Sequence, residues 1–181
     1  GSNGMQKKFI DTTAIIIPVY NEGEVIRSVI EEVLKHFSTV ICVNDGSRDN
    51  SAEEIAKTKA VLINHPLNMG QGAALETGLA YARAQKQLQY FVTFDADGQH
   101  GIDDVQHMLE ELEKSGADIV LGSRFLSKAS REKVPAKKRL MLKLAVWFTK
   151  MSTGLRLTDT HNGLRVMNRK AAEAIESTMP D

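Results

Sequence analysis

The chain has 181 residues, 42% of them hydrophobic and 25% charged, an ordinary composition for one globular domain. Its 23 basic and 23 acidic side chains cancel, so no global positive charge favours a nucleic-acid-binding protein. The single cysteine, Cys42, excludes a disulfide framework and favours a reducing compartment. No apolar run reaches the roughly 20 residues that span a bilayer. We expect a cytoplasmic protein.

Short apolar runs alternate with segments of helical periodicity, which is the pattern of repeated βα units. Strands are predicted at residues 14–19, 39–43, 60–63, 90–94, 118–121 and 163–167. Helices are predicted at residues 22–37, 51–58, 70–85, 102–114, 139–153 and 169–177, with a basic loop at 127–138. The sequence therefore predicts a single α/β domain with a mostly parallel central sheet flanked by helices. In such sheets ligands bind at the carboxyl ends of the strands.

The two ends of the chain carry separate expectations. Residues 1–4 precede Met5 and have the composition of a cloning remnant, so we expect the domain to span residues 5–181. The chain stops soon after the helical pattern that begins at residue 169. We therefore expect the C-terminal part of the domain to be missing.

Polar residues follow the first two predicted strands. The first strand runs into Pro18-Val19-Tyr20-Asn21-Glu22, without the G-x-G-x-x-G of dinucleotide-binding proteins, and the chain has no Walker A sequence. Tyr20 offers an aromatic face to a base, and Glu22 offers an acceptor for its N–H groups. Asp45, after the second strand, can accept hydrogen bonds from a base or ribose. Alternatively, Asp45-Gly46 and residues 49–51 are only turn and capping residues.

Two carboxylates follow the fourth strand in Asp95-Ala96-Asp97-Gly98-Gln99-His100. Without a cation their charges would repel across a short turn, whereas carboxylate, amide and water oxygens suit Mg²⁺ or Mn²⁺. An EF-hand loop would need Gly and Glu where this chain has His100 and Gln106. The segment therefore predicts a metal site for a diphosphate, with a capping turn as the alternative.

These segments resemble glycosyltransferase family 2. PVYNE, NDGSRD and DADGQH match three signatures of that family in order and spacing, and NMGQG is similar to its helix start. The resemblance covers roughly residues 13 to 172. It implies a GT-A (Rossmann-like) fold and a UDP- or GDP-hexose donor. One departure is Asn44-Asp45, where the family usually has two aspartates; if the family's base contact needs the first carboxylate, base recognition is altered.

The resemblance also assigns expected roles to individual residues. Those implied to hold the nucleotide are Pro18, Tyr20, Glu22, Asp45 and Asp95. Those implied to hold Mg²⁺ or Mn²⁺ on the diphosphate are Asp95, Asp97 and Gln99.

Two later segments, GSRF at 122–125 and TDTHNGLR at 158–165, resemble the dolichyl- or polyprenyl-phosphate mannosyl- and glucosyltransferase branch. That branch implies a lipid-phosphate acceptor, held by Arg124 and Arg139; for either arginine the alternative is a surface ion pair. An ionised phosphate can attack the anomeric carbon with inversion and needs no strong base. If the acceptor is a hydroxyl of a cell-surface polysaccharide, Asp159 is the candidate base. We expect Asp97, Arg124 and Asp159 to act in catalysis.

Three further interpretations concern residues 137–151, a second class of function and the histidines. Residues 137–151 are basic at the start and apolar beyond, with the single Trp147, which suits either a helix lying peripherally on the inner face of a membrane or a core helix. A nucleotide-sugar-binding module without turnover is a second class of function. His100 and His161 flank the predicted site, whereas His36, His65 and His107 are expected to be ordinary surface or core residues.

Overall fold

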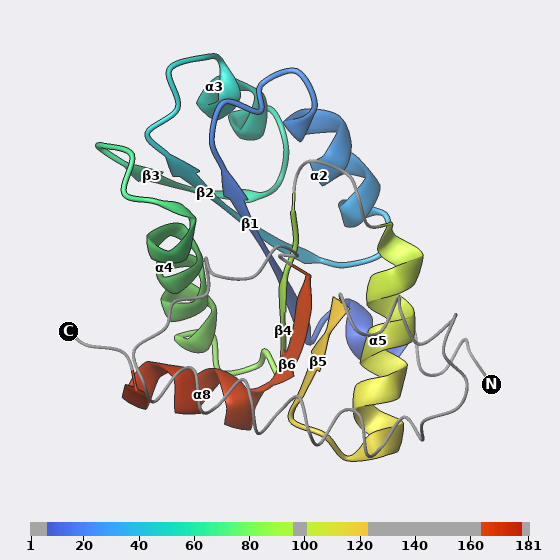
Figure 1. Ribbon diagram of the computed structural model, residues 1–181. Coiled ribbons are helices and arrows are strands. Elements are labelled where there is room, and N and C mark those ends of the chain that lie inside the picture. The colour runs from blue at the N-terminus through green and yellow to red at the C-terminus, as the bar shows by residue number, and fades with distance from the viewer. Residues whose placement is uncertain (1–6, 96–100, 123–163, 179–181) are drawn as a thin grey trace.

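The computed structural model describes residues 7–95, 101–122 and 164–178 (Figure 1). These residues contain a six-stranded sheet in the order β3-β2-β1-β4-β6-β5. The strands are β1 (Thr13–Val19), β2 (Thr39–Asp45), β3 (Val61–His65), β4 (Tyr90–Thr93), β5 (Ile119–Leu121) and β6 (Arg165–Asn168). The helices are α2 (Ile26–Leu34), α3 (Ser51–Ala56), α4 (Gln71–Arg83), α5 (Ile102–Ser115) and α8 (Arg169–Thr178).

The sheet is mostly parallel. β1 pairs in parallel with β2 and β4, and β2 pairs in parallel with β3. β6 is inserted antiparallel between β4 and β5. The predicted α/β domain with a mostly parallel central sheet is confirmed. Because β6 runs the other way, its first residue, Arg165, lies at the edge where the neighbouring strands end.

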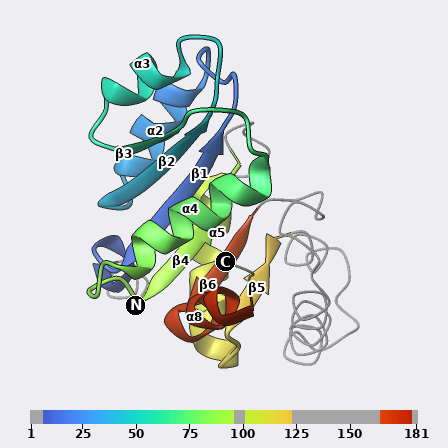
Figure 2. The same ribbon diagram turned by 90° about the vertical axis from the view of Figure 1, so that its left-hand side faces the viewer.

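Helices cover both faces of the sheet, which explains why its central strands are continuous apolar runs. Ile15 and Ile17 of β1 point into a core shared with α2, α3 and α5, whereas Ile16 points into a second core shared with α4 and α8. Figure 2 shows α4 and α8 together on one face. A Cβ on Gly78 would lie 2.4 Å from Cγ2 of Ile16, so this glycine lets α4 approach β1 closely.

Several predicted boundaries are displaced. α2 begins at Ile26 instead of residue 22, and the residues before it form a turn in which the N–H groups of Val25 and Ile26 bond to the carbonyl of Glu22. β2 continues to Asp45 and β3 to His65, each two residues beyond the predicted end. The predicted loop at 127–138 and helix at 139–153 lie outside the described residues. Within the described part, no helix has the length and apolar character required to cross a membrane.

Candidate active site

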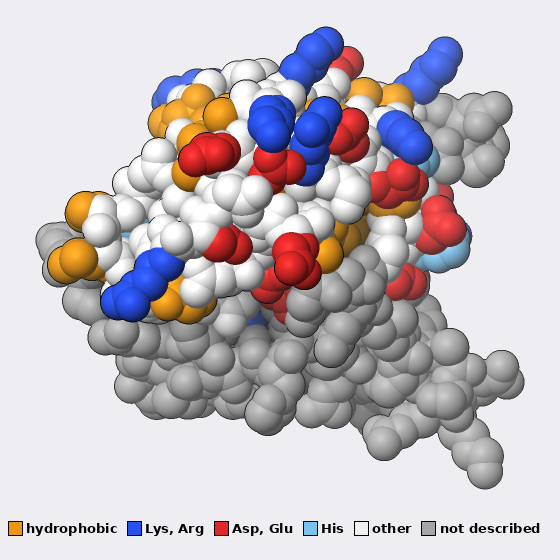
Figure 3. All heavy atoms as spheres, turned by 90° about the horizontal axis from the view of Figure 1, so that it is seen from above, with side chains coloured by type: hydrophobic (Ala, Val, Ile, Leu, Met, Phe, Trp, Pro, Cys, Tyr) orange, Lys and Arg blue, Asp and Glu red, His pale blue; other side chains and the backbone are white. Residues whose placement is uncertain are grey.

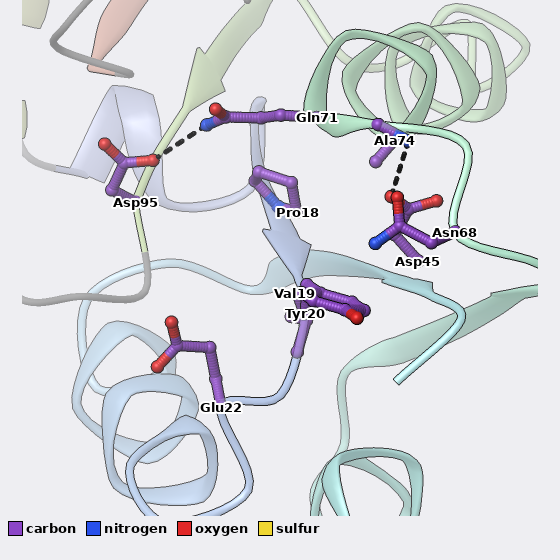
Figure 4. Close-up of a pocket in the computed structure, with 10 residues that line it drawn as sticks. Pro18, Val19, Tyr20, Glu22, Asp45, Asn68, Gln71, Ala74 and Asp95 are labelled. Carbon is purple, nitrogen blue, oxygen red and sulfur yellow. Dashed lines mark hydrogen bonds between the residues drawn. The ribbon is translucent and has the colours of Figure 1, made fainter. Parts of the chain in front are cut away.

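A cavity of about 400 Å³ lies at the carboxyl ends of β1, β2 and β4 (Figure 4). It is lined by Pro18, Val19, Tyr20, Glu22, Asp45, Asn68, Gly70, Gln71, Ala74 and Asp95. The structure thus brings together all five residues that the sequence predicts at a nucleotide. They come from three strand ends, and the segment at the start of α4, which bonds to both Asp45 and Asp95, completes the lining.

The loop after β1 is fixed by the loop after β2. Asn21 has a left-handed backbone (φ 53°). Its N–H donates to Oγ of Ser47 over 2.9 Å, and its Oδ1 accepts the N–H of Arg48 at the same distance. This pair of bonds holds Asn21 in a conformation that Asn tolerates better than most residues. The backbone of Tyr20 is held beside the cavity as a result.

A second pair of bonds joins the same two loops. Oγ of Ser51 accepts the N–H of Glu22, and Oδ2 of Asp49 accepts the N–H of Gly23, each over 2.9 Å. The Ser51 hydroxyl, followed by the backbone N–H groups of Gly23 and Ser51, lowers the pKa of Asp49. The described bonds of Asp49 and Ser51 are those of turn residues that also join the two loops. Their contribution to the site is to position Glu22.

Asp45 is almost fully buried, and its carboxylate is engaged by the chain itself. Oδ1 accepts from Nδ1 of His65 over 2.8 Å and from the N–H of Met69 over 2.9 Å. Oδ2 accepts the N–H of Gly70 over 2.8 Å. A carboxylate offers about four acceptor positions, and the described residues occupy three of them, which leaves one on Oδ2. Asp45 thus braces the segment that connects β3 to α4.

Asn44, the departure from the family signature, is not among the residues that line the described cavity. Its amide Nδ2 donates to Oδ1 of Asn64, the residue paired with it on β3, over 2.9 Å. An aspartate at position 44 could not donate this bond. Its Oδ1 accepts the N–H of Ser47, in the loop after β2, over 3.4 Å. The described side-chain contacts of Asn44 are therefore with β3 and with this loop.

Asp95 forms the other side of the cavity. Nε2 of Gln71 donates to its Oδ1 over 3.2 Å, which joins the end of β4 to the start of α4 (Figure 4). Arg165 of β6 pairs with Thr93, two residues before Asp95, and only 1% of it is exposed. Burial lowers the pKa of Arg165 to about 10, and the charge of Asp95 opposes this shift. Arg165 therefore stays protonated at neutral pH beside Asp95.

The charge of the cavity wall is negative. Glu22, Asp45 and Asp95 supply carboxylates, and none of the other described lining residues is a lysine or arginine. Figure 3 looks onto this edge and shows acidic side chains along one side of a hollow, while basic and acidic side chains are interspersed over the rest of the described surface. A phosphate group would need an added positive charge to bind beside these carboxylates.

Of the three predicted metal ligands, only Asp95 lies in the described part of the chain, and it fits the role. It is half-buried at the cavity wall and offers the hard oxygen that Mg²⁺ and Mn²⁺ prefer. The described residues contain no group of three or more potential metal-binding side chains. The other predicted site residues lie outside the described residues: Asp97, Gln99, His100, Arg124, Arg139, Asp159 and His161.

Sequence reasoning missed His65 and Arg165. The sequence predicts His65 to be a surface or core residue, and its side chain, only 9% exposed, agrees with a core position; its bond to Asp45 was not predicted. The strand-end rule could have found it, had the third strand been predicted to its true end. Arg165 stands in the TDTHNGLR segment without an assigned role, because only the antiparallel pairing of β6 brings it near Asp95.

Comparisons with known proteins agree with this geometry. The sequence profile of Glycosyl transferase family 2 matches residues 14–176. The UDP-N-acetylglucosamine–dolichyl-phosphate N-acetylglucosaminyltransferase of Methanococcus voltae is 30% identical, over 91% of this chain and 72% of that protein. The polyprenol monophosphomannose synthase of Mycolicibacterium smegmatis is 26% identical, over 93% of this chain and 66% of that protein. Both names confirm the resemblance to the polyprenyl-phosphate branch.

Among solved structures, glucosyl-3-phosphoglycerate synthase from Mycobacterium tuberculosis, in complex with Mn²⁺ and UDP-glucose, superposes with a TM-score of 0.60 at 20% identity. The match covers 94% of this chain, which spans 61% of the length of that one. This likeness confirms the predicted GT-A fold. Because the family profile covers nearly the whole chain, the protein belongs to glycosyltransferase family 2.

Proposed function

We propose that this chain is the donor-binding catalytic domain of an inverting glycosyltransferase that moves a hexose from a UDP- or GDP-sugar to a polyprenyl phosphate. The observation that carries the proposal is the cavity at the strand ends, which gathers the five predicted nucleotide-binding residues. Its volume of about 400 Å³ lies within the usual range for small-molecule sites. The names of the two relatives support the lipid-phosphate acceptor.

In this proposal the nucleoside occupies the side of the cavity formed by the ends of β1 and β2. Tyr20 is 46% exposed, so its ring is accessible for stacking on a base. Glu22 supplies an acceptor for base N–H groups, and Asp45 supplies its remaining acceptor position. Pro18 forms part of the floor and Asp95 lies toward the diphosphate.

Asp95, Asp97 and Gln99 would hold the divalent cation. Its positive charge is what an anionic diphosphate needs beside the three carboxylates of the described wall. When bound, the ion stabilises the negative charge that develops on the departing nucleoside diphosphate. Asp97 is assigned to catalysis through this contact.

The acceptor would be held by Arg124 and Arg139, whose guanidinium groups can bind a phosphate through two hydrogen bonds each. A phosphate oxygen forms the new bond to the anomeric carbon while the bond from that carbon to the diphosphate oxygen breaks. The electron pair leaves with the nucleoside diphosphate, and the configuration inverts. An ionised phosphate has no proton to lose, so Asp159 is required as a base only if the acceptor is a sugar hydroxyl.

Calorimetric titration with UDP, GDP and their hexose conjugates, with and without Mn²⁺, tests the donor half of the proposal. We expect one nucleotide to bind only with Mn²⁺, and Asp97→Ala to abolish that binding. Asp11→Ala should bind normally, because Asp11 is an exposed carboxylate before β1, at the opposite edge of the sheet. The assignment of the nucleotide and metal site would be overturned if no nucleotide bound, or if binding were unchanged both without Mn²⁺ and in Asp97→Ala.

A transfer assay tests the acceptor half. Labelled donor is supplied with polyprenyl phosphate in detergent or with an oligosaccharide, and the anomeric configuration of the product is determined by NMR. We expect transfer to the lipid phosphate with inversion. Transfer only to the oligosaccharide would replace the acceptor and give Asp159 the role of base. Donor binding without transfer to either acceptor would support a binding module instead.

A further inference from the structure

A series of two side-chain hydrogen bonds leads from the cavity into helix α4. Nδ1 of His65 lies 2.8 Å from Oδ1 of Asp45, and Nε2 of the same ring lies 2.8 Å from Oγ1 of Thr77. The side chains of His65 and Asp45 are only 9% and 4% exposed. His65 is not among the residues that line the cavity. It therefore stands behind Asp45 and not against a ligand.

The chemistry of the three groups allows a single arrangement of protons for a neutral ring. Both oxygens of Asp45 accept backbone N–H groups, so the carboxylate is the acceptor and Nδ1 of His65 is the donor. The lone pair on Nε2 then accepts the hydroxyl proton of Thr77. An imidazole fixed at both nitrogens cannot rotate without breaking a bond, and it fixes the orientation of the carboxylate in turn.

These hydrogen bonds hold the wall of the cavity in place. Asp45 binds the backbone of Met69 and Gly70, and Gly70 is the residue immediately before α4. Thr77 lies further along the same helix. Helix α4 is thus attached to β2 at two places, at its start directly through Asp45 and in its middle, at Thr77, indirectly through His65. Gly70 and Gln71 both line the cavity, and Gln71 bonds to Asp95.

We propose that His65 is a positioning residue of the donor site, which orients the Asp45 carboxylate and the start of α4 so that the cavity is preformed for a nucleoside diphosphate. The inference rests on the proposed function, since it concerns the same cavity. It assigns His65 no contact with the nucleotide.

The test measures the affinity for the nucleotide that binds the wild-type chain in the presence of Mn²⁺. His65→Leu removes both hydrogen bonds at similar volume. We expect about a tenfold loss of affinity, the lower end of the loss that follows when the hydrogen-bond partner behind a metal ligand is removed. His65→Asn restores a donor toward Asp45 and should recover most of this loss. Thr77→Val removes only the outer bond and should give an intermediate loss.

A double-substitution cycle shows whether His65 and Thr77 act through the same series of hydrogen bonds. Thr77→Val should weaken binding in the wild-type chain but have no further effect in His65→Leu, because the link through which it acts is already broken. Two matched controls remove similar groups at the opposite edge of the sheet. His36→Leu changes a half-buried histidine after α2, and Thr58→Val changes a threonine that bonds to the carbonyl of Ile55.

Thermal unfolding of every variant separates positioning from a merely structural role. Affinities are measured well below the lowest unfolding midpoint, so loss of stability alone leaves them unchanged. If the wild-type protein binds the nucleotide and both His65→Leu and Thr77→Val bind it with unchanged affinity, the inference is overturned and the proposed function stands. If His65→Leu does not fold, the near-isosteric Thr77→Val decides by the same criterion. Absence of nucleotide binding by the wild-type chain would overturn both.

Discussion

Replacing Asp45 by asparagine should destabilise the fold even when no ligand is present. The carboxylate accepts three hydrogen bonds from His65, Met69 and Gly70, and its side chain is 4% exposed. An asparagine has one acceptor oxygen and one donor nitrogen in the same space. The oxygen can keep the two bonds made by Oδ1. The nitrogen then faces the N–H of Gly70, which loses its acceptor.

The size of the effect follows from these three bonds. A buried N–H left without an acceptor costs about 1–3 kcal/mol, and two bonds that change from a charged to a neutral acceptor each weaken by about 1 kcal/mol. Part of this lost stability is offset, because the neutral asparagine does not carry the desolvation cost of a buried charge. We therefore expect the free energy of unfolding to fall by about 3 kcal/mol. For a chain of this length that lowers the midpoint of thermal unfolding by about 6–12 °C.

Urea unfolding followed by circular dichroism measures this difference in the absence of nucleotide and metal. Asp11→Asn is the matched control, because Asp11 is exposed and accepts one hydrogen bond, from Ser38. We expect the control to change the free energy of unfolding by less than about 1 kcal/mol, as for most surface substitutions. An equally small change in Asp45→Asn would refute the reasoning, because it would mean that the carboxylate does not hold the segment between β3 and α4.

Two further predictions concern packing and pH. Gly78→Ala places a methyl group 2.4 Å from Cγ2 of Ile16, so urea unfolding should show a loss of about 1–3 kcal/mol despite the better helix propensity of alanine; unchanged or higher stability would contradict the close packing of α4 on β1. Hydrogen bonds lower the pKa of Asp49 in the folded state. The Asp49 carboxylate therefore stabilises the fold above its ordinary pKa near 3.8, and this contribution is lost as the pH falls through the folded pKa. The stability gap between the wild-type chain and Asp49→Asn should therefore shrink as the pH falls from 7 to 3, and a constant gap would show that ionisation of Asp49 does not matter.

The sequence alone determined the fold class and one side of the site. The run of isoleucines in β1 predicts a strand buried on both faces, and such strands occur in sheets with helices on both sides. Parallel strands end at the same edge of a sheet, so residues that follow strands are brought together without knowledge of the strand order. For this reason the segments that contain Pro18, Tyr20, Glu22, Asp45 and Asp95 could be placed at one edge of the sheet from local patterns. The roles of these residues at a nucleotide were implied by the family resemblance.

Only the tertiary structure decided what lies behind these residues. His65 reaches Asp45 because β2 and β3 pair in a register that puts the two side by side, and Arg165 lies near Asp95 because β6 inserts antiparallel beside β4. Such pairings depend on the packing of both faces of the sheet and join segments that are far apart in the chain. A local pattern of apolar and polar residues can place a residue at a strand end, but it does not show which strands are neighbours or in which register they pair. The role of Asp45 as a brace for α4 therefore became visible only when its partners were in place.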